Sequence, residues 1–149
     1  MNNFNFPTVK LVYEYPVPYN ERTSIDNDEV SFKILKESFG NSIEHHEEMH
    51  ILLLDPANNL KGIYVVSCGG ICVTQFDLRL ILQAALLSNS TYIVVAHNHP
   101  SGNLTPSEAD KRMAKKIYDA CKIIDINIHS FLIISKEKFY NMNEDLLFI

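Results

Sequence analysis

The sequence predicts a mixed α/β domain in which helices pack against the faces of one β-sheet. Apolar residues recur at helical spacing in three segments, and extended apolar runs lie between those segments. The resulting order is helix, two strands, helix, strand, helix and two strands, which is typical of a sheet flanked by helices. A chain of 149 residues with 46% hydrophobic residues suits one domain that buries its own core.

Residues 1–27 are rich in Asn, Pro and Tyr, and we expect them to form an irregular N-terminal arm ahead of a domain at 28–149. The aromatic residues of this arm can dock on the domain itself or on a partner subunit of a homo-oligomer, and both alternatives stay open. The first helix is expected at 28–39, where four apolar residues lie near helical spacing and Gly40 follows as a typical C-terminal residue.

The middle of the chain predicts a hairpin, a helix and a central strand. The segment "EEMHILLLDPANNLKGIYVVSCGG" at 47–70 contains two apolar runs separated by a turn at 56–59, as in a β-hairpin. A helix is expected over 77–89, because its apolar residues share one face. The run "TYIVVA" at 91–96 is apolar on both sides, which indicates a strand buried on both faces of the sheet.

The last third predicts a helix over 106–124 and strands at 127–135 and 138–142. At the helix start, Thr105 is expected to be the cap, Pro106 the first helical residue and Glu108 the partner in a capping box. Ser107 and Asp110 then lie three residues apart on one face of the first turns.

Two histidines, His97 and His99, follow the central strand with one residue between them. In an extended segment both imidazoles lie on one side and Asn98 points away, and Pro100 keeps His99 out of the helical region. Two imidazoles and the Asp110 carboxylate, with a fourth position left to water, form a common set of catalytic zinc ligands. We therefore expect one zinc per chain.

Each of these residues also has an ordinary structural explanation. A histidine can simply end a strand, an aspartate in the first turn of a helix interacts with the helix dipole, and Ser107 can simply begin a helix. Their joint occurrence, as His-x-His, seven residues, Ser, two residues and Asp, favours the metal site.

The segment "HNHPSGNLTPSEAD" at 97–110 resembles the signature of the JAMM (MPN-type) metalloproteases, and its wording is similar to the RadC family in particular. The likeness runs from about Glu47 to the end and includes "LLLD", "GG", "FDLR" and "QAAL". It is close to the short RadC-like JAB domain proteins that lack a helix-hairpin-helix domain.

The resemblance implies a JAMM fold akin to that of cytidine deaminases. It implies zinc held by His97, His99 and Asp110, an upstream glutamate as general acid and base, and Ser107 supporting the tetrahedral intermediate. One departure is plain, because Ser130 and Phe131 stand where many members have an Asp-His pair.

Glu47 and Glu48 compete for the role of that glutamate, and strand alternation sends them to opposite faces. The side of Glu47 is otherwise apolar, whereas the side of Glu48 includes His50. We expect the more apolar side to be better buried, and burial raises the pKa of a carboxyl toward a value useful for proton transfer. The resemblance also favours Glu47, because the family's glutamate falls eight residues before the aspartate ending "LLLD". By the same reasoning Glu48→Gln is expected to be nearly silent.

These residues predict a zinc-dependent metallopeptidase-like hydrolase that acts on a peptide or protein substrate. The alternative is a metal-containing module without turnover that acts in protein binding or in DNA repair and processing. A zinc deaminase of the related fold is excluded, because it would need a later Pro-Cys-x-x-Cys element that the sequence lacks.

Composition limits the partners and the compartment. The formal net charge is −5, and the one basic cluster, at 111–116, is typical of a solvated helix face, so strong duplex-DNA binding is not expected. The chain lacks both a signal-peptide start and an apolar run of about 18 residues, which favours a cytoplasmic protein without membrane contact. Its cysteines, Cys68, Cys72 and Cys121, are expected to be reduced, and His45, His46 and His50 to lie mostly at the surface.

Overall fold

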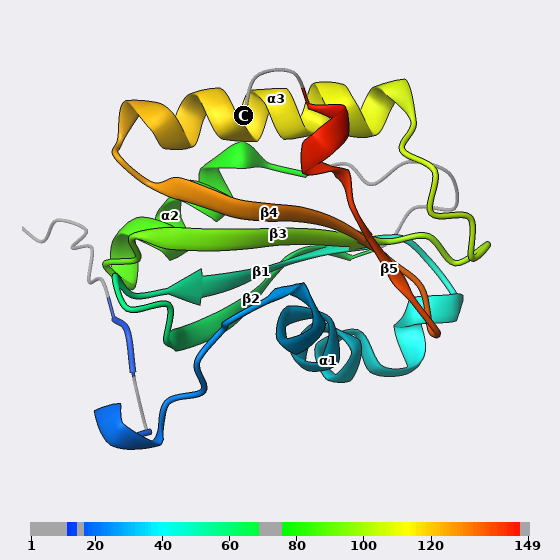
Figure 1. The fold of residues 1–149 in the computed structure, drawn as a ribbon. Helices are drawn as coiled ribbons and strands as arrows, with labels where there is room; N and C mark the ends of the chain where they lie inside the picture. The colour runs from blue at the N-terminus through cyan, green and yellow to red at the C-terminus, as the bar shows by residue number, and fades with distance from the viewer. Residues whose placement is uncertain (1–11, 15–16, 69–75, 147–149) are drawn as a thin grey trace, which may run out of the picture.

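The computed structural model describes residues 12–14, 17–68 and 76–146, and it has the predicted architecture of a mixed sheet with helices on both faces (Figure 1). The described helices are α1 (Asp28–Phe39), α2 (Leu78–Leu87) and α3 (Glu108–Ile123). The strands are β1 (Glu48–Leu54), β2 (Leu60–Cys68), β3 (Tyr92–Asn98), β4 (Asn127–Ile134) and β5 (Phe139–Asn141). Short 3-10 helices are η1 (Tyr19–Glu21), η2 (Gly40–Glu44) and η3 (Met142–Asp145).

The five described strands are ordered β2-β1-β3-β4-β5, so β3 lies at the centre of the sheet. β1 runs antiparallel to both β2 and β3, β3 and β4 are parallel, and β5 returns antiparallel to β4. The central position of β3 confirms the prediction from "TYIVVA", since Ile93 to Ala96 are all buried. Such a strand brings its terminal side chains to the middle of the sheet edge.

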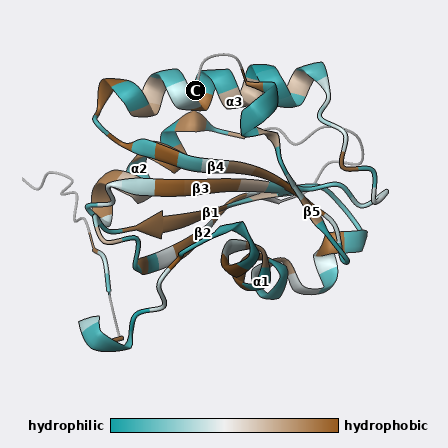
Figure 2. Cartoon of the chain, in the orientation of Figure 1, coloured by the Kyte–Doolittle hydropathy of each residue, from teal (hydrophilic) through white to brown (hydrophobic). Residues whose placement is uncertain are grey.

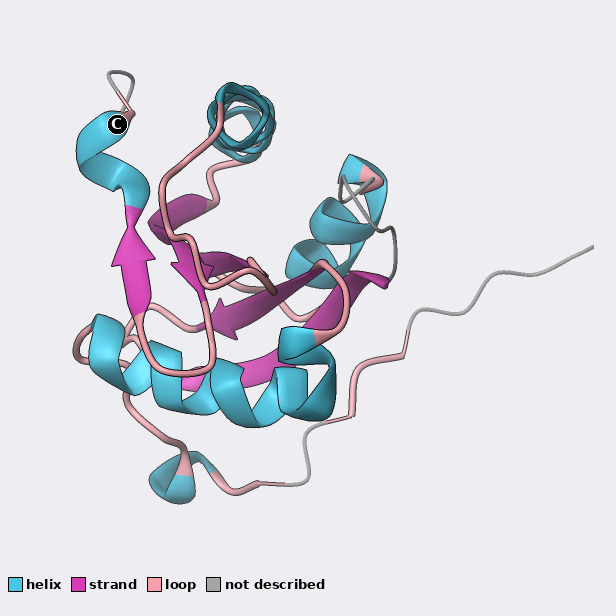
Figure 3. Cartoon of the chain, turned by 90° about the vertical axis from the view of Figure 1, so that its right-hand side faces the viewer, coloured by secondary structure: helices cyan, strands magenta, loops and turns pink. Residues whose placement is uncertain are grey.

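The two faces of the sheet are covered by different helices, as the end-on view shows (Figure 3). α1 packs on one face through Leu35 and Phe39, which meet the alternate strand residues that include Leu52 and Val94. α2 and α3 cover the other face, and their buried residues pack on the remaining strand positions. The hydrophobic strands between these layers form the core (Figure 2). Both faces of β1 and β3 are therefore buried.

Helix boundaries follow local capping. Asn27 caps α1 by accepting the Val30 N–H at 3.0 Å, and Gly40 ends the helix with a φ of 52°, so α1 occupies the predicted residues. Asp77 caps α2 in the same way by accepting the Arg79 N–H at 2.9 Å. The prediction of this helix over 77–89 was therefore close, since α2 starts one residue later and ends before Ser88.

The predicted start of α3 was wrong by two residues. Ser107, not Thr105, is the cap, and the capping box pairs Ser107 with Asp110 rather than Thr105 with Glu108. The Thr105 N–H instead bonds Asn103 Oδ1, and Glu108 pairs with the side chain of Lys111. Ser107 and Asp110 nevertheless meet in the first turn, as expected.

The described part of the N-terminal arm joins the sheet at the start of β2. Ile25 donates its N–H to Asn58, Leu60 donates to Thr23, and Ile25 is only 1% exposed. Among the described residues, no helix is long and apolar enough to cross a bilayer. Cys121 is a buried free thiol, whereas the side chain of Cys68 and the whole of Cys72 lie outside the described residues.

Candidate metal centre

The end of β3 places His97 and Asn98 on opposite sides of the sheet. His97 is 3% exposed and faces the N-terminus of α3, where its Nε2 atom lies 3.1 Å from Asp110 Oδ1. Asn98 is fully buried on the α1 side, where it donates hydrogen bonds to the carbonyls of Ile43 and His46, each at 2.9 Å. The predicted alternation at the strand end is confirmed.

His99 is held by the loop that follows β3. Its main-chain N–H bonds the Ile134 carbonyl at 2.9 Å, and the loop turns at Gly102, whose φ of 77° suits glycine. Its ring atom Nδ1 lies 2.5 Å from the Asn103 carbonyl oxygen. Since a carbonyl only accepts, the neutral ring carries its proton on Nδ1 and keeps a lone pair on Nε2. That lone pair lies on the His97 side, with the two Nε2 atoms 3.0 Å apart.

Asp110 completes the cluster from the first turn of α3. Its Oδ2 atom is 3.7 Å from His99 Nε2, and it also accepts the N–H and the hydroxyl of Ser107, each at 2.7 Å. Burial alone would raise the pKa of Asp110, but His97 and these bonds from Ser107 hold it well below its ordinary value. Asp110 is thus kept as a carboxylate.

His97, His99 and Asp110 could hold a metal ion, because their ligand atoms all lie within 4.8 Å of one another. Two imidazole nitrogens and a carboxylate oxygen are ligands that zinc accepts in catalytic sites. The Nδ1 bond of His99 to a main-chain carbonyl is the kind of second contact that fixes a ligating histidine. The donor set therefore fits the expected zinc.

A cleft of about 350 Å³ opens over this cluster. Glu47 and Ser107 line it together with the three ligand residues, so the structure brings all five predicted site residues to one cleft. Glu47 reaches it from the residue before β1, which neighbours β3 in the sheet.

The burial argument that favoured Glu47 was wrong. Glu48 is the more buried of the two glutamates, at 7% exposure, whereas Glu47 is half-buried in the cleft wall. Helix α1 and η2 cover the side of Glu48 and His50, and the Phe39 ring stacks on His50 with centroids 3.7 Å apart. The polar residue His50 therefore did not mark an exposed face of β1, because α1 covers that face.

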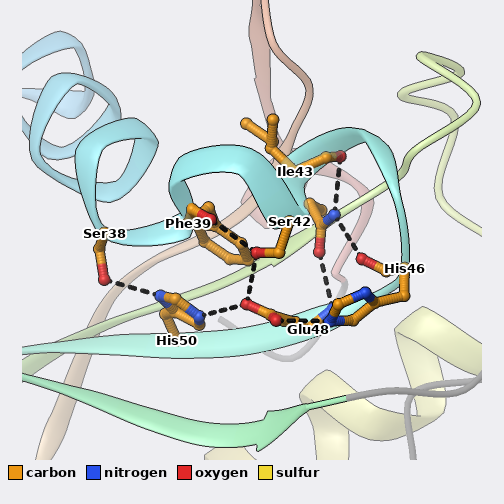
Figure 4. A network of polar contacts seen from close by, with 8 residues as sticks. Ser38, Phe39, Ser42, Ile43, His46, Glu48 and His50 are labelled. Carbon is orange, nitrogen blue, oxygen red and sulfur yellow. Dashed lines mark hydrogen bonds and ion pairs between the residues drawn. The ribbon is translucent and has the colours of Figure 1, made fainter.

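Glu48 belongs to a network of polar contacts on the α1 side of β1 (Figure 4). Its carboxylate bonds Ser42 Oγ and His50 Nε2 at 2.9 Å and His46 Nε2 at 2.7 Å, and His50 Nδ1 lies 2.8 Å from Ser38 Oγ. The expectation of mostly surface histidines was therefore wrong for His50, which is 1% exposed.

Burial alone would raise the pKa of Glu48, but hydrogen bonds from Ser42, His50 and His46 lower it overall. Burial lowers the pKa of His50, and Glu48 offsets part of that shift. In the fold, then, the Glu48 carboxylate is charged at neutral pH and protonation of His50 is disfavoured.

The residues that replace the family's Asp-His pair lie in the core of the sheet. Phe131 packs in the cluster beneath α2 and α3, opposite Val95 of β3. Ser130 is buried opposite Val94. Both residues lie within β4, and Phe131 contributes to the packing of the core.

Sequence reasoning missed two residues that organise this site. Asn98 was expected only to point away from the metal, yet it bonds Glu48, Ile43 and His46. Asn103 sets the tautomer of His99 through its main-chain carbonyl, which carries no side-chain signal. One feature of the sequence could have indicated the role of Asn98. It is an amide at the end of a buried strand, and a buried amide needs hydrogen-bond partners.

Comparison with known proteins identifies the family of this chain. A model of the RadC-like JAB domain matches residues 25–147. A UPF0758 protein of Flavobacterium johnsoniae is 40% identical over 103 residues, which cover 69% of this chain and 45% of that protein. The UPF0758 protein tlr1707 of Thermosynechococcus vestitus is 32% identical over 124 residues, or 83% of this chain and 49% of that protein.

The UPF0758 protein YfjY of Escherichia coli K12 is 34% identical over 98 residues, which cover 66% of this chain and 61% of that protein. The chain spans less than two thirds of the length of each of these three relatives. The family match, in contrast, covers every described helix and strand from α1 to β5 and all three candidate metal ligands. The chain therefore belongs to the family of RadC-like JAB domain proteins.

Proposed function

We propose that this chain is a zinc-dependent hydrolase of the JAMM type that cleaves a peptide or isopeptide bond. The observation that carries the proposal is the convergence of His97, His99 and Asp110 in one cleft with Glu47. Zinc held there would supply a coordinated water with a pKa of about 7 and would polarise the scissile carbonyl.

The ligand residues are held in place by neighbours on separate elements. His97 is fixed by β3, and the bond from His99 Nδ1 to the Asn103 carbonyl keeps the Nε2 lone pair available. Asp110 is oriented by the capping box at the start of α3, where Ser107 binds one of its oxygens and His97 approaches the other. Such contacts fix the orientation of side chains that bind a metal.

Glu47 is the proposed general base and acid. Its carboxylate would accept a proton from the attacking water and return it to the amine that leaves. Its place in the cleft wall beside His97 and His99 supports this role. A half-buried position keeps it in reach of both water and substrate.

Ser107 is the proposed hydrogen-bond donor to the oxyanion, a role that is typically worth about 3 kcal/mol of barrier. In the structure its hydroxyl donates to Asp110 Oδ2. The hydroxyl must therefore turn away from that oxygen to serve the oxyanion. The Ser107 N–H can retain its own bond to Asp110 Oδ2 while it does so.

A metal-holding module without turnover, acting in protein binding or DNA processing, is the second candidate. The prior engagement of the Ser107 hydroxyl with Asp110 favours it. Binding of DNA by such a module is disfavoured, because acidic residues of the same helix pair with part of the basic cluster of α3. Lys111 pairs with Glu108, and Lys115 pairs with Asp119. The placement of Glu47 in the cleft favours the hydrolase. For the hydrolase and for a protein-binding module we propose a protein or peptide partner, and for every candidate a cytoplasmic setting.

The test is hydrolysis of a peptide and isopeptide library by the zinc-loaded chain. We expect cleavage that a chelator abolishes, that zinc restores and that Glu47→Gln lacks despite bound zinc. Chelator-sensitive binding of a peptide without cleavage would instead support the second candidate. Cleavage that persists in Glu47→Gln would contradict the assigned base.

A further inference from the structure

Asn98 lies between the two histidines of the candidate metal centre, yet its side chain is fully buried on the opposite side of the sheet. Its Oδ1 atom accepts the Glu48 N–H at 2.7 Å. Its two Nδ2 hydrogens go to the carbonyls of Ile43 and His46, each at 2.9 Å. Both donors of the amide are thus used on one segment, 43–48, that leads into β1.

These bonds begin where the pairing of β1 with β3 ends. The last pair of the ladder is Met49 opposite His97. Extending this register by one and by two residues places Glu48 opposite Asn98 and Glu47 opposite His99. Just beyond the last pair of the ladder, the side chain of Asn98 accepts a hydrogen bond from the main-chain N–H of Glu48. The residue next to Glu47 is thereby attached to the strand that carries His97.

The side chain of Glu48 is held as firmly as its main chain. Ser42, His46 and His50 all bond its carboxylate on the α1 side (Figure 4). Because successive side chains of a strand point to opposite faces, a Glu48 fixed toward α1 commits Glu47 to the face of the cleft. The location of Glu47 in the cleft wall agrees with this.

From this geometry we propose that Asn98 is a positioning residue for Glu47. It attaches the segment before β1 to β3, so that the Glu47 carboxylate is held in the cleft beside His97 and His99. The significance of Glu47 rests on the proposed function, but the attachment itself needs neither metal nor turnover. Failure of the attachment and failure of the function can therefore be told apart.

Asn143 offers a matched control on another part of the fold. Its Oδ1 atom accepts the Phe131 N–H at 2.9 Å, and its Nδ2 atom donates to the His129 carbonyl at 3.1 Å. Asn143→Ala removes the same kinds of bond as Asn98→Ala, but between η3 and β4. A general loss of stability would appear in both variants.

The first experiment measures amide hydrogen exchange of Glu48 by NMR in the metal-free protein. We expect Asn98→Ala to accelerate this exchange roughly five- to tenfold, as the loss of one buried hydrogen bond predicts, and Asn143→Ala to leave it unchanged. If Asn98→Ala does not fold, Asn98→Ser takes its place in the same comparison. Unchanged exchange in the Asn98 variant, or equal acceleration in Asn143→Ala, overturns the attachment.

The second experiment asks whether Asn98 acts through Glu47, by means of the visible spectrum of the cobalt(II)-substituted protein. We expect Asn98→Ala and Glu47→Gln each to shift the cobalt bands, and the double variant to match Glu47→Gln alone. Asn143→Ala should leave the bands unchanged. A further shift in the double variant, as large as in Asn98→Ala itself, would show that Asn98 acts on the ligands directly and would overturn the positioning role. If both experiments give the expected results and the parent cleaves no peptide, the proposed hydrolase fails and the positioning role stands.

Discussion

Ser107 and Asp110 hold one another through three hydrogen bonds. Ser107 donates its N–H and its hydroxyl to Asp110 Oδ2, each at 2.7 Å, and accepts the Asp110 N–H at 3.1 Å. The other oxygen of the same carboxylate lies 3.1 Å from His97 Nε2. One aspartate thus serves both the cap of α3 and the candidate metal centre, so the first turn of the helix aims the ligand.

Ser107→Ala should lower both stability and activity, because it removes a helix cap and the proposed oxyanion donor. We expect a loss of about 1 kcal/mol in the free energy of unfolding, measured with urea. Ser107→Gly is the control, since glycine is tolerated at a helix cap almost as well as serine but offers no side-chain donor. Stability should largely recover in Ser107→Gly while hydrolysis does not. Recovery of hydrolysis as well would assign Ser107 to capping alone.

Glu47→Gln and Glu48→Gln should fail in different ways. Glu47→Gln should keep the fold and bind zinc but lose hydrolysis, because the proposed base is gone. Glu48→Gln should not be silent, contrary to the expectation from sequence. It replaces a buried carboxylate that bonds Ser42, His46 and His50, and should cost about 1–3 kcal/mol of stability.

Thermal or urea unfolding of the two variants, together with zinc content, separates these outcomes. Loss of hydrolysis only in the Glu48 variant, at unchanged stability, would mean that the two glutamates have exchanged roles. Equal destabilisation in both would show that Glu47 is a structural residue.

The sequence predicted the order of elements and the convergence of the metal ligands because both follow from local pattern. A strand end fixes the direction of His97 relative to Asn98, and a short loop returns the chain to Asp110. What local pattern could not show was that the capping box forms at Ser107 and Asp110 rather than at Thr105 and Glu108. The box of Ser107 and Asp110 is the one that also brings Asp110 to His97, a partner distant in sequence.

The relative burial of Glu47 and Glu48 escaped prediction for a similar reason. Alternation correctly separated their directions, but it does not state which face a helix covers. Phe39 and η2 cover Glu48 and His50, so the face of β1 with more polar residues is buried from solvent. Polar groups inside that layer are stable because they bond one another.

Acid should destabilise the metal-free protein in two ranges of pH. The pKa of His50 is lower in the fold than its ordinary value of 6.5, and that of Glu48 is lower than 4.5. Such groups bind fewer protons when folded than when unfolded, so their contribution is complete above the unfolded pKa and falls as the pH falls. We expect the free energy of unfolding to decrease first below about pH 6.5 through His50 and again below about pH 4.5 through Glu48, joined at lower pH by Asp55 and Asp110, whose pKa values are also lowered in the fold.

Urea unfolding at a series of pH values measures this dependence, and His50→Gln is the control. The variant should lose the decrease between about pH 6.5 and about pH 5 while keeping the one at lower pH. An undiminished decrease in His50→Gln would assign the upper range to another group.

Duplex DNA should bind weakly and in a strongly salt-dependent manner. The net charge is −5, and Lys111 and Lys115 of the basic cluster pair with acidic residues of their own helix. We expect binding to vanish at about 0.15 M salt, as measured by fluorescence anisotropy. A submicromolar affinity that persists at that salt concentration would favour the DNA-processing candidate.

Zinc content of the purified chain tests the central claim most directly. We predict one zinc per chain by elemental analysis, lost in His97→Ala and in Asp110→Ala, because each removes one of three convergent ligands. His45→Ala, which changes an exposed histidine outside the cluster, should keep the full amount. Full zinc retention in either ligand variant, or its loss in His45→Ala alone, would contradict a centre built on His97, His99 and Asp110.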